Sequence, residues 1–171
     1  MTTLILGSQP VLDDWLAQRR ALGQDGHDEV WEGMYHVAPY EHARNGFTAM
    51  RLGVAVEPRA RAAGLWSSGP FNLGERNNFR VPDLGFHRTR DFSLFMPTAA
   101  IVVELLSPDD ETYEKLPFYA AHLVDEVWIV DAVGRTIEIR ERTAVGWDHS
   151  DRSGLLAYNA AEIVAQLDWP G

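Results

Sequence analysis

Two acidic residues, Asp83 and Glu104, lie inside strongly apolar segments of the sequence. Asp83 follows Val81-Pro82, and Glu104 interrupts the apolar run 99–106. Burying an isolated carboxylate is costly unless it is paired with a cation or bound to a metal. If the two segments form neighbouring strands, as consecutive strands do roughly two-thirds of the time, both carboxylates can bind one divalent cation. The pattern therefore predicts a metal site with Asp83 and Glu104 as its ligands.

The expected metal is Mg²⁺, or Mn²⁺ in its place. Mg²⁺ is bound through one or two carboxylates and keeps several waters, which leaves room for a substrate phosphate. A bound metal polarises a phosphoryl oxygen and lowers the pKa of a coordinated water, so the expected chemistry is hydrolysis of a phosphate ester. The alternative is that the carboxylates form only structural ion pairs with an arginine such as Arg80.

Lys115 is the third candidate catalytic residue. It is the only lysine in the chain, whereas the other fourteen basic positions are arginine. A lysine ammonium is compact and has an adjustable pKa, so it can orient an attacking water and offset charge that develops on a phosphate. The alternative is an exposed pair of Glu111 with Lys115, four residues apart on a helix, which would stabilise the chain by about 0.2–0.5 kcal/mol.

The elements that must position these residues form a mixed α/β pattern. The run 99–106 is continuously apolar apart from Glu104, as is typical of a central strand covered on both faces. Gly46, Gly53 and Pro58 weaken the helix expected over 41–63, and Pro117 fits the helix expected over 111–122 only near its first turn. We expect helices over 11–22, 41–63 and 111–122, a strand or hairpin over 29–37, and strands over 65–68, 79–86, 99–106, 127–131 and 136–140.

Length and composition predict a single domain over residues 1–171. The 171 residues, of which 46% are hydrophobic, are enough to bury a core. The absence of cysteine excludes disulfide frameworks, Cys-rich zinc sites and thiol nucleophiles. We find neither a signal-peptide pattern nor an apolar run of about 18 residues, so we expect a soluble cytoplasmic protein with no membrane partner.

The charge is unevenly distributed along the chain. The net charge is −10, which argues against nucleic acid as a partner, but residues 41–90 hold eight arginines and four acids. This segment could form a basic face that binds nucleic acid, or its arginines could be neutralised by acids elsewhere in the fold. Exposed sheet edges would make a homodimer plausible.

Several blocks of the sequence resemble the Uma2 family of the PD-(D/E)XK nuclease superfamily. They are Val81-Pro82-Asp83, the strand ending in Glu104-Leu105-Leu106-Ser107-Pro108, and the segments 111–115, 118–120 and 124–131, with Trp31-Glu32-Gly33 and Ala38-Pro39 with His42 upstream. The resemblance covers roughly residues 28–142.

This resemblance implies a restriction-endonuclease-like core, in which a central mixed β-sheet is flanked by helices. It also implies a metal-dependent endonuclease acting on nucleic acid, with DNA expected, and gives the metal-binding roles to Asp83 and Glu104. The signature expects a lysine two residues after the second acid, where this chain has Leu106. Uma2-like sequences commonly place a lysine on the following helix, which matches Lys115. The alternative function is a catalytically weak or inactive nuclease-fold domain that binds nucleic acid or protein.

Four residues are candidates for supporting roles. His42 could position water or phosphate, or could be a packing residue of its helix. Glu32 and Glu41 could each add a carboxylate to the site, or lie exposed. Glu111 could orient Lys115 or cap its helix.

Overall fold

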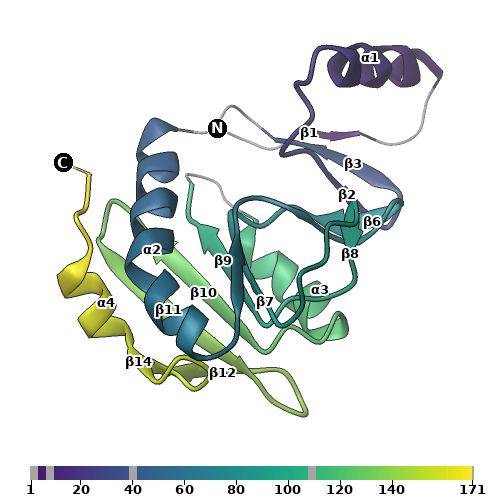
Figure 1. Cartoon of the computed structure of the whole chain (residues 1–171). Helices are drawn as coiled ribbons and strands as arrows, with labels where there is room; N and C mark the ends of the chain where they lie inside the picture. Colours follow the sequence, from purple (N-terminus) through teal and green to yellow (C-terminus); the bar gives the residue numbers. More distant parts are fainter. Residues whose placement is uncertain (1–3, 7–9, 39–41, 108–110, 171) are drawn as a thin grey trace.

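Two six-stranded sheets and the helices that cover them make up the computed structural model (Figure 1). The structure describes residues 4–6, 10–38, 42–107 and 111–170. Both sheets combine parallel and antiparallel pairs, so the predicted α/β class with mixed sheets is confirmed.

The larger sheet has the strand order β12-β11-β10-β9-β7-β4. All five residues of β9 are buried, which confirms the central strand predicted from its apolar run. β9 pairs with β10 in parallel and with β7 antiparallel. The strands are β4 (Trp66–Ser68), β7 (Leu84–His87), β9 (Ile101–Leu105), β10 (Glu126–Asp131), β11 (Thr136–Arg142) and β12 (Trp147–Ser150).

The second sheet has the order β1-β3-β2-β6-β5-β8. It contains the hairpin predicted over 29–37, which appears as β2 and β3. The strands are β1 (Leu4–Leu6), β2 (Glu29–Trp31), β3 (Met34–Val37), β5 (Asn72–Glu75), β6 (Asn78–Arg80) and β8 (Phe95–Met96); β13 (Arg152–Ser153) and β14 (Tyr158–Asn159) form a separate two-stranded sheet.

Helices cover both faces of the larger sheet. On one face, Leu52 and Val56 of α2 pack in a core with Val103 and Trp128. On the opposite face, Phe118 of α3 packs in a second core with Val102 of β9 and Ile129 of β10. The helices are α1 (Pro10–Ala21), α2 (Ala43–Ala62), the 3₁₀ helix η1 (Thr112–Lys115), α3 (Leu116–Ala121) and α4 (Ala160–Gln166). Of the helices in the described ranges, none is long and apolar enough to cross a membrane.

Two predicted elements differ in the structure. The run 79–86 is not one strand: β6 ends at Arg80 in the second sheet and β7 begins at Leu84 in the larger sheet, so residues 81–83 connect the two sheets. Pro82 has no N–H for a ladder hydrogen bond, which favours such a break. The helix predicted over 111–122 begins as η1 and continues as α3, so Pro117 lies in the first turn of α3, where proline is tolerated.

Candidate active site

Asp83 lies where the chain enters the larger sheet. The β7–β9 register ends with the pair of Leu84 and Val103, and the Asp83 N–H donates to the Val103 carbonyl at 3.1 Å. The Leu105 N–H donates to Asp83 Oδ2 at 2.7 Å, which orients this carboxylate at the carboxyl end of β9.

Glu104 is almost completely buried in β9, with 3% of its surface exposed. The Tyr119 hydroxyl donates to Glu104 Oε1, and Lys115 Nζ lies 3.2 and 3.3 Å from the two carboxylate oxygens. Burial raises the pKa of Glu104 to about 8, and the negative charge of Asp83 adds to this effect while Lys115 opposes it. The carboxyl group is therefore poised to hold or release a proton near neutral pH.

Lys115, at the end of η1, contacts carboxylates from both sheets. Its Nζ is 2.9 Å from Glu29 Oε1 in β2 and 3.2 Å from Glu104 Oε1 in β9. Burial disfavours the ammonium, but the charges of Glu104 and Glu29 outweigh burial and raise the pKa of Lys115. Only 13% of the side chain is exposed, so the alternative of an exposed helix pair with Glu111 is wrong.

Glu29 is a member of this cluster that the sequence analysis missed. Its carboxylate accepts hydrogen bonds from the Val81 N–H at 2.8 Å and the Trp31 Nε1–H at 2.6 Å. Burial alone would raise the pKa of Glu29, but Lys115 and the Val81 N–H outweigh burial and lower it. The signal was available, because Glu29 is also an acid in a segment of strand-forming residues and meets the same burial cost as Asp83 and Glu104.

The charges of this cluster fit a divalent cation. Asp83, Glu104 and Glu29 provide three carboxylates against the single ammonium of Lys115, a net charge of −2 when all are ionised. Within the described ranges, no three His, Asp or Glu side chains converge on one metal position. Asp83 and Glu104 are the two carboxylates that could hold such a cation, and Mg²⁺ is commonly bound through one or two carboxylates and several waters.

Two of the predicted supporting residues, His42 and Glu32, are exposed. His42 is the exposed N-cap of α2, and its Nδ1 accepts a hydrogen bond from the Arg44 N–H at 3.3 Å. Glu32 lies exposed in the β2–β3 turn with a left-handed φ of 52°. Glu41 lies outside the described residues. Neither His42 nor Glu32 is among the ion-pair partners of Lys115 in the described structure.

Glu111 pairs with a histidine rather than with Lys115. Its Oε2 lies 3.3 Å from His36 Nδ1 in β3. Glu111 occupies the N-cap position of η1, as predicted, but its side chain makes no capping hydrogen bond there.

Arg80 does not take the place of Lys115 beside Glu104. The Arg80 guanidinium lies over the rings of Trp31 and Phe118, 4.2 and 4.0 Å from their centroids, and donates to the Val30 carbonyl. Burial lowers the pKa of Arg80, although the nearby acids oppose this shift. The ion pair of Glu104 is thus with Lys115.

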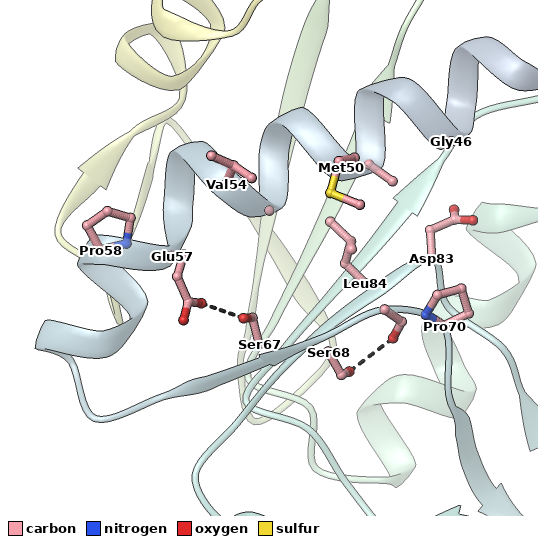
Figure 2. A pocket seen from close by; sticks show the side chains of 13 residues that line it. Gly46, Met50, Val54, Glu57, Pro58, Ser67, Ser68, Pro70, Asp83 and Leu84 are labelled. Atoms are coloured by element: carbon pink, nitrogen blue, oxygen red, sulfur yellow. Dashed lines mark hydrogen bonds between the residues drawn. The ribbon is translucent and has the colours of Figure 1, made fainter.

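A groove of about 550 Å³ leads away from Asp83 (Figure 2). It lies between α2 and residues 67–70, and Asp83 lines it together with Leu84. Most of its lining residues are apolar, and Met50 and Val54 project from α2 beside it.

Comparisons with known proteins show the family and a similar fold. The family model described as "Uma2: Putative restriction endonuclease" matches residues 16–164. A solved structure from Anabaena variabilis ATCC 29413, described as "a putative nuclease belonging to DUF820", has a similar fold with a TM-score of 0.62. The two sequences are 13% identical, and the match covers 81% of this chain and 90% of the other. The comparison with curated proteins gives no match.

Proposed function

Because the chain belongs to the Uma2 family, described as "Putative restriction endonuclease", we propose that it is a metal-dependent endonuclease that hydrolyses phosphodiester bonds in DNA. The observation that carries this proposal is the convergence of Asp83, Glu104 and Lys115. These residues come from three separate segments and lie together where the two sheets meet.

In the proposed mechanism, Asp83 and Glu104 hold Mg²⁺ or Mn²⁺. The bound ion would polarise the scissile phosphate and lower the pKa of an attacking water. Asp83 is held in place by the Leu105 N–H, and Glu104 must release its proton to act as a ligand. The Lys115 ammonium, kept charged by Glu29, supplies positive charge beside the reacting phosphate.

Cleavage of DNA by the purified protein tests this proposal. We expect cleavage in Mg²⁺ or Mn²⁺ that is lost in EDTA, and we expect Asp83→Asn and Glu104→Gln to abolish it. Lys115→Met should reduce the rate by about 100-fold or more, the scale seen when one charge-stabilising donor is removed. Glu114→Gln is the matched control, because Glu114 is exposed and adjacent to Lys115. Undiminished cleavage by folded Glu104→Gln protein would overturn the assignment.

A second candidate is a nuclease-fold domain that binds nucleic acid or protein without cleaving it. The observation that favours it is the enclosure of the site: Glu104 is 3% exposed, and Lys115 already contacts two carboxylates. Calorimetric titration with Mg²⁺ separates the two candidates. Saturable binding that is lost in Asp83→Asn supports the enzyme, whereas a stable partner complex without metal binding supports the binding domain.

A further inference from the structure

The groove that ends at Asp83 has an apolar wall facing solvent. Met50 and Val54 of α2 are 67% and 66% exposed, and Leu84 and Pro70 line the groove with them. The volume of about 550 Å³ is within the range of about 300–1,000 Å³ found for small-ligand sites.

Two glycines, Gly53 and Gly69, line this groove and have open space beside them. A Cβ atom built on Gly53 of α2, or on Gly69 in the opposite wall, would meet no heavy atom within 4 Å. Neither glycine has a positive φ that would require its lack of a side chain. The space beside both residues is therefore available to a flat group that approaches the backbone closely.

The charge of the groove excludes a phosphate backbone as its main occupant. Its single ionisable lining residue besides Asp83 is Glu57, a carboxylate that already contacts Arg61 and Ser67. Phosphates bind where lysines and arginines cluster, and the described lining contains neither. A nucleobase needs no such charge, because an unpaired base can stack between apolar side chains, which line most of this groove.

We propose that the groove binds an unpaired nucleobase next to the scissile phosphate, so that the substrate is single-stranded or locally unpaired nucleic acid. This inference rests on the proposed function, since Asp83 belongs both to the groove and to the proposed metal site. A base stacked inside a duplex cannot enter the groove until it is unpaired and unstacked, which costs free energy. Single strands and unpaired sites avoid that cost.

Oligonucleotide binding in the Asp83→Asn background tests the inference without depending on cleavage. The probe is a short DNA strand with a fluorescent 2-aminopurine base, used single-stranded and as a fully paired duplex. We expect the single strand to bind more tightly and its fluorescence to change on binding. Filling the groove by Gly53→Leu, and independently by Gly69→Leu, should weaken this binding about tenfold or more, within the range for loss of one base-stacking contact.

Gly26→Leu is the matched control, because Gly26 is exposed, its added Cβ also meets open space, and it lies outside the groove. Leucine forms helix better than glycine, so Gly53→Leu should keep α2 folded, which thermal melting checks. Equal affinity for duplex and single strand, or unchanged affinity in both groove variants, would overturn the inference. So would a wild-type dimer that dissociates in Gly53→Leu by sedimentation, because the groove would then be a subunit interface. A wild-type protein that binds as expected but cleaves nothing contradicts only the proposed function.

Discussion

The ammonium of Lys115 joins two buried carboxylates that come from different sheets. Glu29 lies in β2 and Glu104 in β9, and each is within 3.2 Å of Lys115 Nζ. Pairs of this kind contribute little net stability, because desolvation offsets their attraction, but removing one partner leaves a costly buried charge. At the residue scale, the protonation of Glu104 therefore controls the energetics of the site.

The raised pKa of Glu104 predicts a pH-dependent stability of the metal-free protein. The folded pKa of about 8 lies above the ordinary value of 4.5, so the contribution of Glu104 is fully present below pH 4.5 and is lost as pH rises to 8. Glu104→Gln cannot ionise. The wild type should therefore lose stability relative to Glu104→Gln as pH rises. In EDTA, we expect the difference between their free energies of unfolding to grow by up to about 1.4 kcal/mol per pH unit between pH 5 and 8.

Urea unfolding at each pH measures this difference, with Glu114→Gln as the control that should follow the wild type. Parallel wild-type and Glu104→Gln curves across this range would show that Glu104 is ionised throughout.

The cost of burying a carboxylate identified Asp83 and Glu104 from the sequence, but it did not identify the residues that pair with them. Asp83 and Glu104 were found because each interrupts an apolar segment. In the structure, Asp83 directly precedes β7 and accepts a hydrogen bond from the Leu105 N–H, next to Glu104 in β9. The contact between Lys115 and Glu29 joins residues 86 positions apart, so local spacing carries no signal for it. The nearby Glu111 was the apparent partner of Lys115, but tertiary packing pairs it with His36.

At the scale of elements, the segment 81–83, which connects β6 of the second sheet to β7 of the larger sheet, holds parts of the site in place. The Val81 N–H donates to Glu29 in the second sheet, while the Asp83 N–H donates to the Val103 carbonyl in the larger one. The sequence showed the apolar character of 79–86 but not this division, because both strands share the same strand-forming residues. The short strands β12 to β14 and helix α4 were not predicted either, since their stability depends on packing more than on local pattern.

Gly74 in β5 tests how closely α3 packs against the second sheet. Gly74 has a φ of +120°, and a Cβ there would lie 2.4 Å from the Asn78 carbonyl oxygen and 2.8 Å from the Phe118 ring. Gly74→Ala should therefore destabilise the protein by about 2–5 kcal/mol, because backbone strain and overpacking add. Urea unfolding measures the loss.

Gly64→Ala is the control for backbone strain alone. Gly64 has a φ of +75°, but its added Cβ meets nothing within 4 Å. A loss in Gly74→Ala no larger than that in Gly64→Ala would contradict the close packing of Phe118 on β5.

At the scale of the whole molecule, ion pairs account for much of the uneven charge. Three arginines of the segment 41–90 pair with acids outside it. These pairs support the alternative in which acids elsewhere in the fold neutralise the arginines, rather than the one in which the arginines form a basic face. The pairs are Arg51 with Asp168 at 3.3 Å, Arg59 with Glu162 at 4.0 Å and Arg88 with Asp125 at 2.7 Å. With a net charge of −10, the chain as a whole is expected to displace few counterions from DNA.

The affinity of the Asp83→Asn protein for single-stranded DNA should therefore depend only weakly on salt. Each phosphate neutralised on a single strand contributes about −0.7 to the slope of log K against log salt concentration. We expect about two such contacts or fewer, hence a slope no steeper than about −1.5, because base stacking in the groove supplies most of the affinity. Fluorescence titrations across a salt series measure the slope, and Arg51→Gln, which removes a paired arginine, should leave it unchanged. A slope steeper than about −4 would instead require an extended basic surface, and the arginine pairs would then have to open when nucleic acid binds.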